Sequence, residues 1–259
     1  MKRYCLYLFI LIGISCSAEL KAQRNGTVYK GNDPAVRYTG RTLVSPDGSV
    51  AFDWVGTYLE TRFTGGKLSV KVSETGTSYY NVFVDGKLHK VVKVCGTDTL
   101  IHLVSGIDKR IHSLKIQKRS EGEFGKTTVH QFVLSGSGRL AEEPAVRTRH
   151  IEFIGNSLTC GYGTDGKHRD EPFLVETENC NLTFASMIAR YYDADYTLIA
   201  HSGRGAARNY GDSVRVSKVT MKDRMLNTFD EDLTHKWNFK GYVTSDCGAI
   251  DDIFNHHKT

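Results

Sequence analysis

The sequence predicts an all-β sandwich followed by an α/β domain, and three observations support this order. Short runs of β-branched and aromatic residues, separated by turn residues, fill residues 25–138. A strand, a helix and a second strand follow within residues 151–200. Between them, residues 138–149 form a polar stretch that includes Glu142 and Glu143. Closely spaced short strands are typical of a sandwich, and the order strand, helix, strand is typical of a parallel βαβ unit.

Seven or eight short strands are expected in the first domain. Leu68, Val70 and Val72 alternate along one of them, which indicates a strand buried on one face. The dipeptide Asp85-Gly86 favours a two-residue hairpin turn, because that turn needs positive φ. The expected strands cover residues 49–54, 58–63, 67–73, 79–84, 87–94, 99–104, 113–118 and 128–134.

The second domain is expected to begin with a strand over residues 151–154. A polar loop over residues 164–179 precedes a helix that Asn181 can cap. Apolar residues on this helix recur at i, i+3, i+4 and i+7, which predicts one buried stripe consisting of Phe184, Met187, Ile188 and Tyr191. The next strand is expected over residues 196–200.

The first candidate site residue is Ser157. Residues 150–163 read HIEFIGNSLTCGYG, so a β-branched run stops at Gly155 and Ser157 follows within a turn of small residues. A serine at the carboxyl end of a buried strand enters the crevice where open α/β sheets bind ligands, and its hydroxyl can attack a carbonyl there. The alternative is an ordinary βα turn, because Gly, Asn and Ser are common turn residues.

A second loop adds to this signal. Residues 198–211 read LIAHSGRGAARNYG, again a strand followed by a glycine-rich loop, whose amides can stabilise an oxyanion. Together the two segments resemble the SGNH (GDSL-type) hydrolases. The resemblance implies that Ser157 is the catalytic nucleophile and that Gly203 supplies the second amide of the oxyanion hole. Asn156 stands where the family usually has an aspartate, a residue that does not itself attack.

The resemblance narrows to carbohydrate esterase family 2 with four further segments, FDWVGTYLETRFTGGKLSVKV, YYNVFVDGK, RTRHIEFIGNS and VETENCNLTFASMIARYY. It implies a jelly-roll sandwich followed by an SGNH-type three-layer domain, and removal of acetyl groups from plant polysaccharides such as xylan or mannan. The expected divisions are a signal peptide (1–22), the β-sandwich (25–140), a partial SGNH domain (149–236) and a tail (237–259).

Two blocks of the SGNH pattern are missing from the sequence. They are the Gly-x-Asn-Asp block, which completes the oxyanion hole, and the Asp-x-x-His block, which carries the base. We therefore expect a truncated α/β domain with impaired activity. His256 and His257 are weak candidates for the base, because Asp252 and His256 are separated by three residues instead of two. His201 is expected to pack or bond locally.

The tail, WNFKGYVTSDCGAIDDIFNHHKT, instead resembles the nucleophile region of family 3 glycoside hydrolases, with Asp246 at the nucleophile's position. The tail alone lacks a general acid, and retaining hydrolysis needs two carboxyl groups around the sugar. We interpret the tail as a foreign junction from a fused or rearranged reading frame. The alternative is a third parallel strand over residues 241–245. Both interpretations can be true at once, because a tail of foreign origin can still form a strand.

Three functional hypotheses follow. The leading one is a serine esterase that acts on acetylated polysaccharide or oligosaccharide through an acyl-Ser157 intermediate. The second is a non-catalytic carbohydrate-binding or scaffold protein with Trp54, Tyr79 or Tyr80 as sugar platforms, although a tryptophan in a strand is more often in the core. The third, a family 3 glycosidase, rests on the tail alone.

The first 22 residues resemble an export signal, with a basic start at Lys2-Arg3, an apolar run over residues 4–14 and Ala22 before the expected cleavage. The run is too short for a membrane span. These features predict a periplasmic or extracellular protein. The alternative is lipid anchoring through Cys16.

The composition fits a globular protein, with 40% hydrophobic and 24% charged residues. The formal net charge of +5 is not concentrated in a basic stripe, so nucleic acid is not an expected partner. No cysteine spacing is typical of a zinc or redox site, and no metal or cofactor is predicted. Cys160 either pairs with Cys180 or is a small buried apolar residue.

Overall fold

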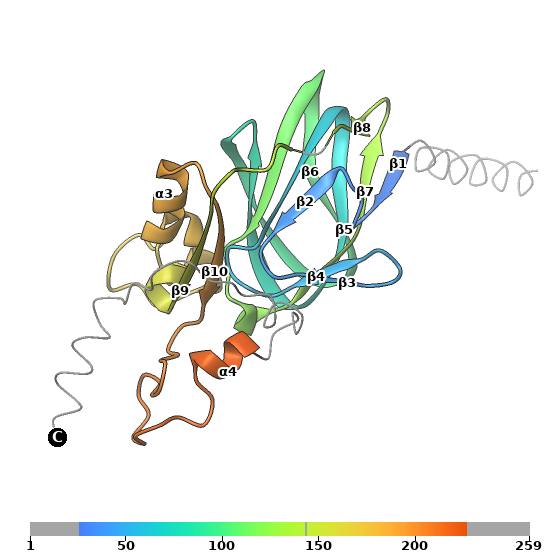
Figure 1. Cartoon of the computed structure of the whole chain (residues 1–259). Helices are drawn as coiled ribbons and strands as arrows, with labels where there is room; N and C mark the ends of the chain where they lie inside the picture. The colour runs from blue at the N-terminus through green and yellow to red at the C-terminus, as the bar shows by residue number, and fades with distance from the viewer. Residues whose placement is uncertain (1–25, 143, 227–259) are drawn as a thin grey trace, which may run out of the picture.

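The computed structural model describes residues 26–142 and 144–226 (Figure 1). Within them, eight strands form a large sheet and two form a small one. The large sheet contains β1 (Gly26–Lys30), β2 (Val36–Thr39), β3 (Leu43–Val44), β4 (Val50–Phe52), β5 (Tyr58–Val84), β6 (Lys87–Lys118), β7 (Thr127–Ser135) and β8 (Arg139–Leu140). The small sheet contains β9 (His150–Gly155) and β10 (Asp195–Ala200). The helices are α2 (Ser157–Cys160), α3 (Phe184–Tyr191) and α4 (Met221–Leu226), with short 3₁₀ turns η1 (Gly122–Phe124), η2 (Val175–Thr177) and η3 (Cys180–Leu182).

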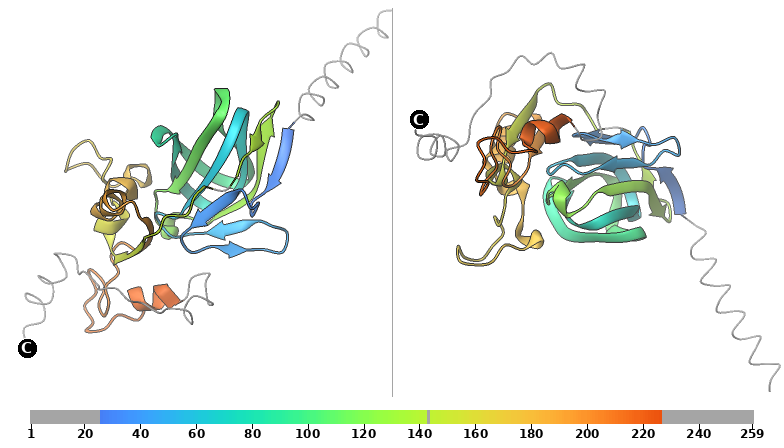
Figure 2. Two further views of the ribbon diagram at one scale, coloured as in Figure 1. Left: turned by 45° about the horizontal axis from the view of Figure 1, so that its top comes forward. Right: turned by 90° about the horizontal axis from the view of Figure 1, so that it is seen from below.

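The large sheet is antiparallel and curls around one apolar core (Figure 2). Leu68, Val70 and Val72 all lie in this core and are at most 4% exposed, so the predicted alternation along their strand is confirmed. Phe63 and Phe132 are fully buried beside them. The described part of the chain is therefore mostly β, with a curled half-barrel and few helices (Figure 1).

Six of the expected short strands are segments of only two long strands, β5 and β6. Glycines that indicated strand ends instead lie at irregularities in the ladder. At Gly66, φ is +88° and a Cβ atom would lie 2.4 Å from the Ser135 carbonyl oxygen, so glycine allows the strand to bend without ending. The hairpin turn between β5 and β6 is confirmed, since Asp85 and Gly86 have φ of 50° and 75°.

The small sheet confirms the predicted strand, helix, strand order. β9 and β10 pair in parallel, and α3 lies in the connection between them (Figure 1). Their apolar side chains share a second core with Tyr58 of β5, so the two sheets pack against each other. No helix of the described residues is both long and apolar enough to cross a membrane.

The predicted buried stripe of α3 is wrong. Its four residues are 40% or more exposed: Phe184, Met187, Ile188 and Tyr191. The buried face consists of Ala185, Ser186 and Ala189, which lie against the second core. Small side chains allow the helix to approach the sheet closely, which a pattern of large apolar residues does not reveal. The helix begins after Thr183, whereas Asn181 lies within η3 and accepts a hydrogen bond from Arg190.

The observed orientation of α3 predicts opposite sensitivities for two of its residues. Ala189→Leu should lower the free energy of unfolding by about 1–3 kcal/mol, because added methylenes have no space in a packed core. Met187→Ala should change it by less than about 0.5 kcal/mol, because Met187 is 51% exposed. Urea unfolding followed by circular dichroism measures both. A larger loss for Met187→Ala than for Ala189→Leu would contradict the orientation.

A buried ionic cluster joins the two sheets at the start of β10. Asp195 accepts hydrogen bonds from Arg37 on β2, Tyr58 on β5 and Arg147 in the linker, each at 2.7 Å. Arg37 also pairs with Glu60. Although burial alone would raise it, the pKa of Asp195 is lowered well below its usual range by these donors and by the charge of Arg37. The cluster fixes β10, and therefore the loop that follows it, relative to the large sheet.

Candidate active site

Both loops that the sequence singled out lie at the same edge of the small sheet. Gly155 and Ala200 are paired in register at the carboxyl ends of β9 and β10. The amide of His201 donates to the carbonyl of Gly155 at 3.2 Å, which holds the two loops together at their base. The turn containing Ser157 and the loop containing Gly203 therefore start side by side.

Ser157 begins the single turn α2, and its neighbours explain the shape of this turn. Asn156 caps it by accepting a hydrogen bond from the Leu158 amide at 3.1 Å. Asparagine and aspartate cap helices about equally well, so Asn156 can perform the structural role of the usual aspartate. A Cβ atom at Gly155 would lie 2.0 Å from the Thr159 hydroxyl, so a side chain there would displace the turn. The Ser157 side chain is partly exposed.

The loop after β10 places Gly203 at the surface. Gly203 has φ of +70°, and nothing lies within 4 Å of the position that a Cβ atom would take. Its carbonyl accepts the amide of Tyr210 at 3.0 Å. Asn209, which is buried, accepts from the Gly205 amide and donates to the Val219 carbonyl, and these bonds hold the rest of the loop.

The large sheet contributes a residue to this edge that the sequence reading missed. Glu121 follows β6 and is 1% exposed. Its Oε2 accepts the amide of Ser202 at 2.6 Å, and its Oε1 accepts the Ser202 hydroxyl. The two residues are 81 positions apart in the sequence, so no local spacing indicates the contact. In the sequence, the only indication of Glu121 is that it stands in a run of polar residues directly after a strand.

Glu121 lies in a buried acidic cluster. Its amide donates to Glu178 Oε2 at 2.9 Å, and the second carboxylate oxygen of Glu178 is buried without a partner. Burial and the charge of Glu121 raise the pKa of Glu178, and burial raises the pKa of the Cys160 thiol. Atoms of Glu121, Cys160 and Glu178 lie within 4.8 Å of one another, a separation that a metal ion could bridge. Both oxygens of Glu121 already bind Ser202, so within this cluster only Glu178 keeps a carboxylate oxygen without a partner.

The raised pKa of Glu178 predicts a pH-dependent stability. The unfolded carboxyl ionises near its ordinary pKa of 4.5, whereas the folded one stays protonated to higher pH. The folded state then binds more protons, so the free energy of unfolding should fall as the pH rises above about 5. Lys118 also faces the cluster, and burial lowers its pKa to about 8. Stability should therefore be compared only at pH values below about 8, where Lys118 does not change its charge.

Glu178→Gln should remove this fall while keeping an oxygen for the Glu121 amide. Urea unfolding at pH 5 and pH 7.5 should show the variant gaining stability relative to the wild type at the higher pH. Glu176→Gln, at an exposed position on the same loop, is the matched control. If the free energies of unfolding of Glu178→Gln and wild type differ by the same amount at both pH values, the Glu178 carboxyl is not protonated in the folded protein.

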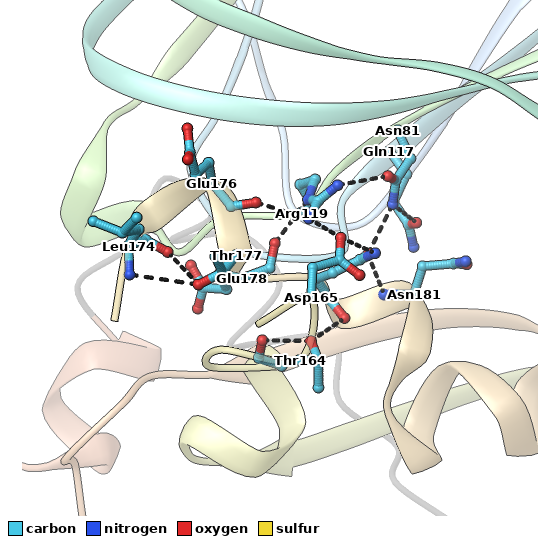
Figure 3. A network of polar contacts seen from close by, with 12 residues as sticks. Asn81, Gln117, Arg119, Thr164, Asp165, Leu174, Glu176, Thr177, Glu178 and Asn181 are labelled. Carbon is cyan, nitrogen blue, oxygen red and sulfur yellow. Dashed lines mark hydrogen bonds and ion pairs between the residues drawn. The ribbon is translucent and has the colours of Figure 1, made fainter. Parts of the chain in front are cut away.

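Arg119 fastens the loop that follows the Ser157 turn to the large sheet (Figure 3). Its guanidinium donates to the carbonyls of Glu178 and Glu176 at 2.7 and 2.9 Å, and pairs with Asp165. At the other side of the loop, the amide of Asn179 donates to the Gly161 carbonyl at 2.9 Å. This loop therefore connects the sheet to the end of α2.

Two of the cysteines and two of the three candidate sugar platforms are buried. Cys160 and Cys180 are buried free thiols, so the alternative of a disulfide between them is wrong. Trp54 is 5% exposed and packs with Ile199. Tyr80 is 3% exposed in the main core, so neither aromatic ring can serve as a surface platform. Tyr79 remains partly exposed and donates to Glu176.

No histidine or carboxylate of the described residues is hydrogen-bonded to the Ser157 hydroxyl. The Ser157 hydroxyl has no hydrogen-bond partner within residues 26–142 and 144–226. His201 bonds locally, as predicted, because its Nδ1 lies 2.9 Å from the Ser202 carbonyl oxygen. His256, His257 and Asp246 lie outside the described residues, as do the expected strand over residues 241–245, the signal peptide and Cys16.

The fold and the two loops define a class in which a β-rich domain precedes an α/β unit with a serine turn. Residues 38–144 match the family model of the carbohydrate esterase 2 N-terminal domain. The cellulase/esterase CelE of Acetivibrio thermocellus is 34% identical over 212 residues, which cover 82% of this chain and 25% of CelE. An acetylxylan esterase/glucomannan deacetylase of Cellvibrio japonicus is 31% identical over 79% of this chain and 57% of its own length.

Solved structures agree with the sequence matches. A family two carbohydrate esterase from Clostridium thermocellum, in complex with cellohexaose, superposes with a TM-score of 0.70 at 32% identity and covers 76% of this chain and 59% of that one. The chain is therefore a relative of carbohydrate esterase family 2. It spans a quarter of the length of CelE and about half of the length of the Cellvibrio enzyme.

Proposed function

We propose that this protein is a serine esterase that removes O-acetyl groups from plant cell-wall polysaccharide. The observation that carries the proposal is the pairing of Gly155 with Ala200, which places the Ser157 turn and the Gly203 loop side by side at one sheet edge. The acetylxylan and glucomannan substrates of the Cellvibrio relative support the substrate class. The match of residues 38–144 to the family's N-terminal domain supports a jelly-roll sandwich. The parallel pairing of β9 with β10, with α3 in their connection, supports a partial SGNH-type domain after it.

In the proposed reaction, the Ser157 oxygen bonds to the acetyl carbonyl carbon and its proton passes to a base. The carbonyl oxygen becomes an oxyanion, which the Gly203 amide stabilises. The carbon–oxygen bond to the sugar then breaks, and the sugar hydroxyl leaves with a proton. Water releases acetate from the acyl-Ser157 intermediate and restores the enzyme. The proposal includes export of the protein, for which residues 1–22 are the support.

Acetate release distinguishes this proposal from carbohydrate binding without turnover. The full chain is incubated with an aryl acetate and with acetylated xylan, and free acetate is measured. Retention on insoluble xylan is measured in parallel. Release of acetate from both substrates is the expected result. Retention on the polysaccharide without any acetate release would favour the non-catalytic binding protein and would overturn the esterase.

A further inference from the structure

The carboxylate of Glu121 reaches from the large sheet into the loop that carries the proposed oxyanion donor. Both of its oxygens are engaged by one residue, since Oε2 accepts the Ser202 amide at 2.6 Å and Oε1 accepts the Ser202 hydroxyl. Hydrogen bonds to an ionised carboxylate are shorter and stronger than neutral ones. The Ser202 backbone is therefore held from outside its own domain.

The next peptide along the chain, which joins Ser202 to Gly203, is held by His201. Its Nδ1 lies 2.9 Å from the carbonyl oxygen of Ser202, so this nitrogen carries the proton and donates. The peptide that joins Ser202 to Gly203 is planar and trans, so its C=O and N–H groups point in opposite directions. Holding the Ser202 carbonyl toward His201 therefore fixes the direction of the Gly203 N–H.

Glu121 stabilises both parts of this arrangement. Besides binding Ser202, its Oε2 lies 3.5 Å from His201 Nδ1, on the side of the ring that donates to the Ser202 carbonyl. Its own amide donates to Glu178, which keeps the backbone of Glu121 in place. Because Glu121 is 1% exposed, water cannot replace these contacts without opening the joint between the two sheets.

We propose that Glu121 is a positioning residue of the esterase site, which fixes the Gly203 amide in the orientation that an oxyanion requires. The inference rests on the proposed function. It gives the β-sheet domain a role in catalysis: the domain supplies the group that pre-organises the oxyanion loop. A donor that is already oriented stabilises the oxyanion more than a flexible donor does, because it need not reorient during the reaction.

Two substitutions of Glu121 separate positioning from simple loss of structure. Glu121→Gln keeps an oxygen for the Ser202 amide, so kcat should fall by no more than about tenfold. Glu121→Ala removes both contacts, so kcat should fall by about 10² to 10³, as for loss of an oxyanion donor, while KM changes by less than about threefold. Ser202→Ala, which removes only the hydroxyl contact, provides an intermediate variant if Glu121→Ala does not fold. Glu142→Gln, at an exposed position, is the matched control.

Amide hydrogen exchange at Ser202 and Gly203 is the second readout and does not require turnover. Exchange at Ser202 should accelerate by about tenfold or more in Glu121→Ala, because a hydrogen bond to a charged group is lost, and by less in Glu121→Gln. Faster exchange together with the kcat loss supports the proposal. Unchanged exchange, or faster exchange with kcat within about threefold of wild type, overturns it. A wild-type chain that releases no acetate overturns the proposed function, and exchange alone then decides whether Glu121 holds the loop.

Discussion

Ser157→Ala is expected to reduce esterase turnover to the background of the uncatalysed reaction, a loss that reaches about 10⁶-fold in an enzyme with a complete triad. The alanine cannot form the bond to the acetyl carbon, and neither the Gly203 amide nor the Glu121 contact can replace that step. The turn itself should remain intact, because its shape depends on the Asn156 cap and on Gly155, not on the Ser157 hydroxyl.

Steady-state hydrolysis of an aryl acetate measures this effect, with circular dichroism to verify the fold. Ser213→Ala is the matched control, since Ser213 is exposed in the same domain. It should keep the wild-type rate. A Ser157→Ala protein that retains a tenth of the wild-type turnover would remove Ser157 from the mechanism.

Asp195→Asn should lower the free energy of unfolding at pH 7 by about 3–5 kcal/mol, the usual effect of removing one partner from a buried ion pair. The substitution leaves the largely buried guanidinium group of Arg37 with less compensating charge, and it weakens the pairing of the partly exposed Arg147. The Asp195 side chain is 5% exposed, so water cannot substitute for its carboxylate. Because β10 ends at the Gly203 loop, the same change should loosen the candidate site.

Asp193→Asn provides the control for this prediction. Asp193 forms one contact to Arg147 at 3.2 Å, and its side chain is 91% exposed. Asparagine also tolerates its positive φ, so this variant should lose less than about 1 kcal/mol. Urea unfolding measures both variants. A loss of less than 1 kcal/mol for Asp195→Asn would show that the cluster does not stabilise the joint between the sheets.

The pH dependence gives a second test of the Asp195 cluster. Since the folded pKa of Asp195 is depressed, its stabilisation is present above the ordinary pKa of 3.8 and is lost as the pH falls through the lowered value. Wild type should therefore lose stability on acidification below about pH 4 more steeply than Asp195→Asn.

Local chemistry in the sequence was sufficient to predict the hairpin at Asp85-Gly86 and the parallel order of β9 and β10. Positive φ is a property of the turn residues themselves, and β-branched runs indicate strands at short range. The face of α3 was not predictable in this way. Its packing depends on the small residues Ala185 and Ala189, and the stripe of large apolar residues indicated the opposite face.

The site was predictable only where it is formed by the loops themselves. Ser157 and Gly203 stand in recognisable segments directly after strands, and their catalytic roles stay predictions. Glu121 contacts Ser202 across 81 residues, and Arg119 contacts Glu178 across 59, so both depend on how the two sheets pack. Sequence patterns describe the elements of each sheet, whereas contacts between the two sheets depend on the assembled fold.

If acetyl transfer proceeds through Ser157, the acyl intermediate can be detected by mass spectrometry of the quenched reaction. The protein is mixed with excess aryl acetate, stopped in acid within the first turnovers, digested and sequenced by fragmentation. We expect an acetyl group on Ser157 in the wild type and none on that peptide in Ser157→Ala. Steady acetate release by Ser157→Ala, or release by the wild type with the acetyl group on another residue, would contradict it.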